Sequence, residues 1–231
     1  MTKSPVVDYF TKELAQAYDE RNKKLLPISE CLHFLMGLSL KELPTHSRIL
    51  CVGVGTGAEI FSLSKNFPEW TFVGVDPSAS MIDVCRERLR DAKLLDRCEL
   101  IHGDVFDIPK SESFDAVLSI LVAHFVKKEE RHDFYKAMIN LLKKDGYLVN
   151  AEISYDLDSL EFPEMLKNWG QIQGLMGATT ESLANLPKQL REILSIIPNT
   201  ETEKILQECG IQNPIRFFQA FMITAWHGKR L

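Results

Sequence analysis

Short apolar runs alternate with longer amphipathic segments along most of the chain. Five of these runs are rich in β-branched residues and are predicted to form strands, at 48–54, 71–76, 98–104, 114–121 and 146–153. The longer segments place apolar residues at helical spacing, as in 81–95 and 131–144. Strands that alternate with helices in this way predict an α/β fold built on a mainly parallel sheet.

The C-terminal part of the chain departs from this alternation. Residues 213–229 have the pattern of two consecutive strands with too little sequence between them for a crossover helix, so we expect an antiparallel hairpin. About 60 residues between the fifth strand and this hairpin look helical, which is more than one crossover helix requires. We therefore predict a single domain over 1–231 that carries a helical insertion at 154–200, a candidate substrate lid.

The N-terminal segment, 1–45, also shows helical spacing, interrupted by Pro27. It precedes the first predicted strand and can fold over the carboxyl edge of the sheet, where ligands bind in open α/β folds. We predict that this segment is a second, N-terminal helical lid.

Composition narrows the functional classes. Hydrophobic residues make up 45% and charged residues 26% of the chain, which is typical of a globular protein. The net charge of -5 disfavours broad binding to a phosphate backbone, so no direct nucleic-acid binding is expected. No apolar run approaches the roughly 20 residues that span a bilayer, and the N-terminus lacks a signal-peptide core, so we expect no membrane association and a cytoplasmic location. The cysteines and histidines lack the spacing of metal ligands, and no metal site is predicted.

The stretch "ILCVGVGTGAEIFSLS" breaks an apolar strand with glycines before a helix begins. A P-loop is very poorly matched, because no lysine follows the glycines until Lys65. A dinucleotide fingerprint fits better, with Gly53, Gly55 and Ala58 in the turn and Asp76 at the end of the second strand. A purely structural strand-to-helix turn is a further alternative.

Further blocks follow in a fixed order. "GVGTG" puts Gly57 at the helix entry, "VDPSASMIDVCRERL" follows the second strand, and "HGDVFDIP" has Asp104 at the tip of the third. Together with the C-terminal hairpin, these blocks resemble the class I S-adenosylmethionine-dependent methyltransferases, over about residues 48–153. The resemblance implies a Rossmann-like, seven-stranded sheet in the order 3-2-1-4-5-7-6, with S-adenosylmethionine as the cofactor and S-adenosylhomocysteine as the product.

The resemblance also implies which residues bind this cofactor. The predicted cofactor residues are Gly53, Gly55 and Gly57 around the methionine part, Asp76 on the ribose hydroxyls with Pro77 beside it, Asp104 and Val105 on the adenine, and Met81 and Ile120 on either side of the ligand. Each has a plainer alternative. Asp76 can cap a helix, Asp104 can form a turn, and Met81 and Ile120 can be core.

One position departs from the family pattern. Many members carry an acid two residues before the first glycine, where it helps to bind the methionine amine, and this chain has Cys51 instead. The segment "QAYDERN" resembles the N-terminal lid of small-molecule methyltransferases, so Tyr18 is predicted to close over the site and Arg21 to reach the cofactor carboxylate. Structural or solvated roles are the alternatives for both.

Methyl transfer from a sulfonium needs mainly alignment and exclusion of water. A base is required only for protonated acceptors, and His124, just beyond the fourth strand, is the candidate catalytic base, with a structural histidine as the alternative. An NPPY-type motif is absent after that strand, which together with the acidic charge favours a small-molecule acceptor. Apolar residues of the insertion could line its pocket or pack between helices: Phe162, Met165, Leu166, Trp169, Leu175 and Met176.

Two further functions stay open. The tail from Thr200 resembles that of the carboxy-S-adenosylmethionine synthases, which modify the cofactor itself for tRNA modification, although "LPKQLREIL" does not clearly reproduce that family's arginine for the added carboxylate. A cofactor-binding protein without catalysis is the other alternative, and an NAD-dependent oxidoreductase is less favoured than either. A homodimer is an open expectation for the oligomeric state.

Overall fold

The structure is a computed structural model that describes residue 20 and residues 22–231 of the chain. Its centre is one seven-stranded sheet with the strand order β3-β2-β1-β4-β5-β7-β6. The strands are β1 (Arg48–Val52), β2 (Thr71–Asp76), β3 (Cys98–His102), β4 (Phe114–Ile120), β5 (Leu142–Ile153), β6 (Ile211–Ala220) and β7 (Ile223–Arg230). Strands β1 to β5 pair in parallel, whereas β7 is antiparallel to both β5 and β6. The predicted fold class, strand order and C-terminal hairpin are confirmed.

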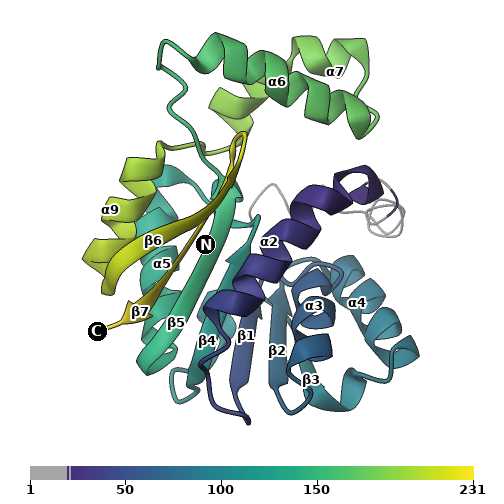
Figure 1. The fold of residues 1–231 in the computed structure, drawn as a ribbon, viewed down its shortest axis with the longest axis vertical. Helices are drawn as coiled ribbons and strands as arrows, with labels where there is room; N and C mark the ends of the chain where they lie inside the picture. The colour runs from purple at the N-terminus through teal and green to yellow at the C-terminus, as the bar shows by residue number, and fades with distance from the viewer. Residues whose placement is uncertain (1–19, 21) are drawn as a thin grey trace.

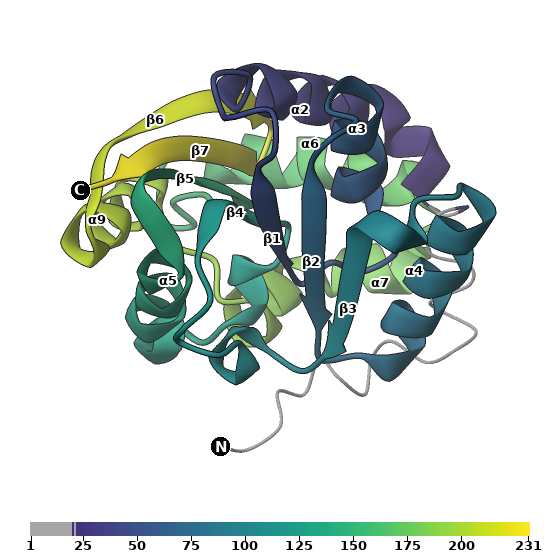
Figure 2. The ribbon, with the colours of Figure 1, turned by 90° about the horizontal axis from the view of Figure 1, so that it is seen from below.

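Helices cover both faces of this sheet (Figure 1 and Figure 2). The main ones are α2 (Leu26–Ser39), α3 (Ala58–Asn66), α4 (Ala79–Asp91), α5 (Arg131–Asn140), α6 (Phe162–Leu175), α7 (Thr180–Ala184), α8 (Leu186–Lys188) and α9 (Asn199–Cys209). None of the described helices is long and apolar enough to span a membrane.

The central strands are buried on both faces, which explains why they are continuous apolar runs. In β1, Leu50 and Val52 belong to the core that includes residues of α5 and α9, whereas Ile49 and Cys51 belong to the core that includes residues of α2, α3 and α4. This alternation follows from the two-residue period of a strand. Alternate residues of this one short strand therefore pack against the two helical layers.

The junction between α5 and β5 differs from the prediction. The pattern predicted a helix to residue 144 and a strand from 146, but α5 ends at Asn140 and β5 begins at Leu142. Leu142 pairs with Phe114 at the start of β4, and the register then shifts before the regular ladder begins. Asp145 takes a left-handed conformation with φ 62° at this irregularity. Pairing with β4 thus overrides the local helical spacing of "LLKK".

Helices α6 to α8 and a π-helical turn, η6 (Gln189–Ile193), form an insertion between β5 and α9. Their apolar side chains, Trp169 and Leu190 among them, share a core with Met222 in the turn between β6 and β7 and with Ile28 at the start of α2. Leu121, which follows β4, packs against the same core. The insertion therefore sits beyond the carboxyl ends of the parallel strands, at the top of the molecule in Figure 1.

The two ends of the insertion are hydrogen-bonded to each other and to the segment that follows β4. The Ser154 hydroxyl and the Tyr155 N–H donate to the Ile197 carbonyl (2.7 and 3.1 Å), which ties the outgoing chain to the returning one. The Ser195 N–H donates to the His124 carbonyl (2.9 Å) just after β4. The insertion thus has a narrow, hydrogen-bonded base.

Candidate functional site

The glycine turn joins β1 to α3 in a conformation that side chains resist. Gly53, Gly55 and Gly57 all have positive φ, at 66°, 52° and 88°. An added Cβ would lie 2.5 Å from Val122 at Gly53 and 2.9 Å from the Cys85 sulfur at Gly57, but at Gly55 no atom of the described residues would lie closer than 4.0 Å. The turn is therefore packed against the protein at both ends and open at its middle glycine, where a ligand can approach the backbone.

Asp76, the last residue of β2, holds this turn. Its Oδ2 accepts a hydrogen bond from the Gly55 N–H (2.9 Å) and its Oδ1 accepts one from the Ser78 N–H (2.8 Å). Burial raises the pKa of Asp76, and these two hydrogen bonds and His102 oppose the rise. Each carboxylate oxygen keeps a second lone pair, so the predicted contact with ribose hydroxyls stays a prediction that this geometry allows.

The cap of α4, which was the alternative role for Asp76, is formed by Ser78. Ser78 is the N-cap of α4, and its hydroxyl accepts from the Met81 N–H (3.4 Å). Met81 is buried in the first turn of α4, while Pro77 is exposed beside Asp76. The Pro77 carbonyl lies 3.1 Å from Nε2 of His102, which joins the ends of β2 and β3.

Asp104 lies just after β3 and forms the turn that was its alternative role. Its Oδ1 accepts from the Phe106 N–H (2.8 Å), and its own N–H donates to Oδ2 of Asp107 (2.9 Å), which is a capping box on the short helix η3 (Val105–Asp107). The Asp104 side chain is exposed and Val105 is buried. The first N–H groups of such a turn have no partner inside it, so the predicted adenine contacts stay a prediction.

The sheet brings these predicted residues together. The glycine turn follows β1 and Asp104 follows β3, while Asp76 and Ile120 are the last residues of β2 and β4. These four strands are adjacent and parallel. Their carboxyl ends therefore meet at one edge, and the insertion lies over the same edge. Tyr18 and Arg21 lie outside the described residues, so their predicted roles are not addressed.

His124 is placed differently from the expectation for a catalytic base. It lies in the short helix η4 (Ala123–Phe125), is 3% exposed, and its Nδ1 accepts a hydrogen bond from the Ile153 N–H (3.3 Å). Burial, followed by the charge of Arg131, lowers the pKa of His124 to about 3. A ring with so low a pKa is a weak base at neutral pH. The catalytic role stays a prediction, and the geometry favours the structural alternative.

A buried carboxylate that the sequence did not single out lies beside the glycine turn. Glu59, in the first turn of α3, is 8% exposed, and its Oε2 has no hydrogen-bond partner among the described residues. Acidic residues are common in the first turn of a helix, so a glutamate two residues after Gly57 is not by itself a signal of a binding site. The signal that could have found it is its place four residues before Leu63, on the buried stripe of the helix.

A second buried carboxylate, Glu152 near the end of β5, is fully engaged. Glu152 is 0% exposed and pairs through Oε2 with Arg131, which is also 0% exposed. Its Oε1 accepts from the Tyr135 hydroxyl (3.1 Å) and from the Thr202 hydroxyl (2.8 Å). Arg131 also donates to the Ser195 carbonyl (2.6 Å). This network joins β5, α5 and α9 to the base of the insertion.

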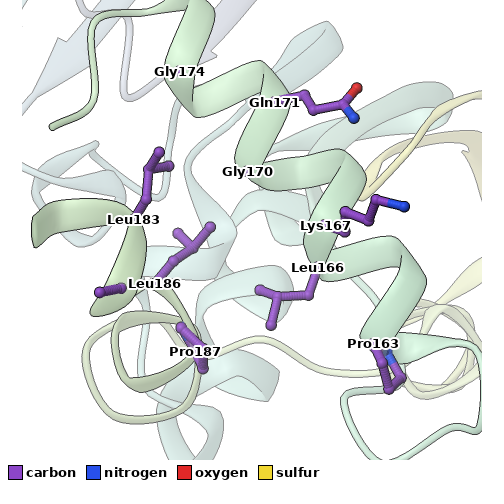
Figure 3. Close-up of a pocket in the computed structure, with 10 residues that line it drawn as sticks. Pro163, Leu166, Lys167, Gly170, Gln171, Gly174, Leu183, Leu186 and Pro187 are labelled. Atoms are coloured by element: carbon purple, nitrogen blue, oxygen red, sulfur yellow. The ribbon is translucent and has the colours of Figure 1, made fainter. Parts of the chain in front are cut away.

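The insertion carries an open groove of about 590 Å³ between α6 and the α7–α8 segment. Figure 3 shows Leu166 extending from α6 on the side of Leu186 and Pro187, while Lys167 and Gln171 extend on the other side. None of the described cofactor residues lines this groove. Of the insertion residues expected at an acceptor pocket, Phe162 and Trp169 are instead buried in the core of the insertion, and Leu175 is exposed.

A family model described as a methyltransferase domain matches residues 49–146. The matched segment contains the glycine turn, Asp76, Asp104 and Ile120, and it lies within the strand order described above. Residues 49–146 are a methyltransferase domain of the class I S-adenosylmethionine-dependent type. This methyltransferase accordingly takes S-adenosylmethionine as its cofactor.

Known proteins resemble the methyltransferase over most of its length. The carboxy-S-adenosyl-L-methionine synthase of Campylobacter hominis is 24% identical over 217 residues, which cover 88% of this chain and 86% of that protein. The magnesium protoporphyrin IX methyltransferase of Synechocystis PCC 6803, solved with S-adenosylhomocysteine, has a TM-score of 0.71 at 16% identity and covers 99% of this chain and 100% of that one. An O-methyltransferase family protein from Burkholderia thailandensis has a TM-score of 0.62 at 14% identity and covers 86% of this chain. The methyltransferase spans only 56% of that longer chain. At these identities the solved structures establish the shared fold.

Proposed function

We propose that this methyltransferase transfers the methyl group of S-adenosylmethionine to a small-molecule acceptor. The observation that carries the proposal is the insertion, whose apolar core packs against Leu121 after β4 and against the turn between β6 and β7, beyond the carboxyl edge that holds the glycine turn. An insertion in this position limits the acceptor to a molecule that fits between it and the carboxyl edge of the sheet. It also keeps water from the sulfonium. Alignment and desolvation can then supply most of the acceleration, because the donor is already activated.

Residues of the chain fit the cofactor that this reaction needs. Gly55 leaves its backbone open to a ligand, and Asp76 retains hydrogen-bond capacity on both oxygens beside it. S-adenosylmethionine carries no phosphate, which agrees with a glycine turn that has no lysine until Lys65. When bound, the cofactor would supply the transferred methyl group. The cytoplasmic location and the homodimer expected from the sequence remain part of this proposal.

A second function is favoured by the relative from Campylobacter hominis, which aligns over nearly the whole chain. A synthase of that kind modifies the cofactor with a carboxyl group and needs a cation to bind it. Arg191, the arginine of "LPKQLREIL", donates to Oδ1 of Asp158 (2.9 Å) and to the Leu157 carbonyl (2.6 Å). Since Arg191 is engaged in this way, the synthase-like activity is the second candidate.

Mass spectrometry of the ligand extracted from purified protein separates the two functions. S-adenosylmethionine or S-adenosylhomocysteine alone is expected for the methyl transfer, and a carboxylated species would favour the synthase. Thermal denaturation with S-adenosylhomocysteine and NAD side by side provides the cofactor control, because a ligand at 100 times its Kd stabilises by about 2.7 kcal/mol. Stabilisation by NAD alone would overturn the proposal. Release of S-adenosylhomocysteine from S-adenosylmethionine on addition of an acceptor pool then identifies the acceptor class.

A further inference from the structure

Glu59, in the first turn of α3 and two residues after Gly57, has a buried carboxyl oxygen without a partner among the described residues. More than nine-tenths of the residue is buried, and the oxygen in question is Oε2. A buried polar atom without a partner costs roughly 1 to 3 kcal/mol, and more when it is charged. An acceptor oxygen left in this state within a ligand site indicates that a donor arrives with the ligand.

No group among the described residues supplies that donor. The carboxylate raises the pKa of the Cys51 thiol at the end of β1 and of the Cys85 thiol in α4, after burial as the main cause in each, and Asp76 at the end of β2 raises the pKa of Glu59 in turn. Arg88 of α4 donates to the Thr56 carbonyl (2.9 Å) and lies over the Phe61 ring. The described titratable groups that act on the carboxylate are thus two buried thiols and another acid, from the ends of β1 and β2 and from α4.

S-adenosylmethionine has two cationic centres, of which only the ammonium is a hydrogen-bond donor. We propose that Glu59 is the anion that receives the ammonium group at the methionine end of the cofactor. Cys51, at the end of β1, provides no negative charge there, and Glu59 brings one to the same place from α3. The N-terminus of α3 favours the ionised carboxylate once the ammonium is present. The inference rests on the cofactor of the proposed function and adds the residue that selects its amino-acid part.

The titration of Glu59 agrees with this role. Burial raises the pKa of Glu59 to about 7, with its own backbone N–H lowering it and Asp76 raising it. Near neutral pH the ligand-free protein therefore holds this group partly protonated. Arrival of an ammonium favours the carboxylate, so binding should release protons to solvent.

The test compares two ligands that differ only at the amino-acid end. Calorimetric titration of wild type and Glu59→Gln uses S-adenosylhomocysteine, which keeps the ammonium, and 5′-methylthioadenosine, which lacks it. Because Glu59→Gln loses a charge-assisted hydrogen bond, its affinity for S-adenosylhomocysteine should be roughly 10- to 150-fold lower than that of wild type. Affinity for 5′-methylthioadenosine should stay within about twofold. Glu87→Gln, an exposed glutamate of α4, is the matched control and should change neither.

The outcomes separate the inference from the function beneath it. Absence of S-adenosylhomocysteine binding by wild type would overturn the cofactor site itself. Equal affinity of wild type and Glu59→Gln for S-adenosylhomocysteine would overturn the role of Glu59, and so would an equal loss for both ligands. If Glu59→Gln does not fold, titration of wild type at pH 6 to 8 in buffers of different ionisation enthalpy decides instead. Proton release on binding S-adenosylhomocysteine but not 5′-methylthioadenosine supports the proposal, and no difference between the two contradicts it.

Discussion

Two buried glutamates lie near the carboxyl edge of the same sheet, and they differ in whether their carboxylate oxygens have hydrogen-bond partners. Glu152 at the end of β5 is bound by Arg131, Tyr135 and Thr202, so both of its oxygens are satisfied within the chain. Glu59 beside the glycine turn has an oxygen with no partner among the described residues. A satisfied carboxylate holds elements together, whereas an unsatisfied one is available to a ligand.

Asp76 stands between these two cases. Each of its oxygens accepts one backbone N–H, and each retains a lone pair for a ligand. The three carboxylates therefore form a series, from one with both oxygens bonded within the chain to one with an oxygen that has no partner among the described residues. The predictions below test that series by removing one partner at a time.

Arg131→Met should have the largest effect. It leaves Glu152 buried without its cation and frees the Ser195 carbonyl at the base of the insertion, so the free energy of unfolding should fall by about 3 to 5 kcal/mol. Urea denaturation measures this loss. Arg86→Met removes an exposed pair with Asp83 and should cost no more than about 1 kcal/mol. Similar losses in the two variants would contradict a structural role for the Glu152 network.

Glu59→Gln should change the pH dependence of stability in the ligand-free protein. The folded-state pKa of Glu59 is about 7 against an ordinary value of 4.5, so the protonated form favours the folded state. That stabilisation is complete below about pH 4.5 and is lost as pH rises through 7, by an amount on the order of 3 kcal/mol. The free energy of unfolding of the glutamine variant should therefore rise relative to that of wild type as the pH increases from 5 to 8.

Urea denaturation of both proteins across this pH range checks that gain. Asp76, Cys51 and Cys85 face Glu59 and are present in both proteins, and burial raises the pKa of the Cys85 thiol to about 12, outside this window. A difference between the two proteins that does not vary with pH would show that Glu59 is ionised in the unliganded fold at all of these pH values.

Asp76→Ala should lower the affinity for S-adenosylhomocysteine by about 100-fold or more. The substitution removes a hydrogen-bond acceptor for the ligand and also the two hydrogen bonds from the Gly55 and Ser78 N–H groups. Calorimetric titration measures the change, with circular dichroism to confirm folding. The affinity of Asp83→Ala, a substitution at an exposed position of α4, should stay within about twofold of that of wild type. Unchanged affinity in a folded Asp76→Ala protein would remove Asp76 from the site.

Thr202→Val should have the smallest effect. It preserves shape and removes one of the three donors to Glu152, so the expected loss of stability is about 1.5 to 2 kcal/mol. Thr200→Val, an exposed position on the same helix, should change stability by no more than about 0.5 kcal/mol. Equal effects of these two substitutions would show that Arg131 and Tyr135 satisfy Glu152 without Thr202.

Much of the cofactor half of the molecule could be predicted from local patterns. The glycines that require positive φ, the acid that ends β2 and the hairpin without room for a crossover helix all lie within short stretches of sequence. The capping box at Asp104 is equally local. The boundary at Leu142 could not be predicted in this way, because it depends on pairing with Phe114, which lies far away in the sequence.

The sequence by itself determined the succession of strands and helices along the chain, the place of the glycine turn and the C-terminal hairpin, because periodicity and turn chemistry act over neighbouring residues. The order of the strands in the sheet and the cofactor residues were implied by the resemblance to a known family. Only the tertiary structure decided the state of the charged groups. His124 is buried and neutral, Glu152 is satisfied by residues of α5 and α9, and Glu59 has an unpaired oxygen. Burial and partnership depend on groups that folding brings together from distant parts of the chain, and a pattern along the sequence does not record them.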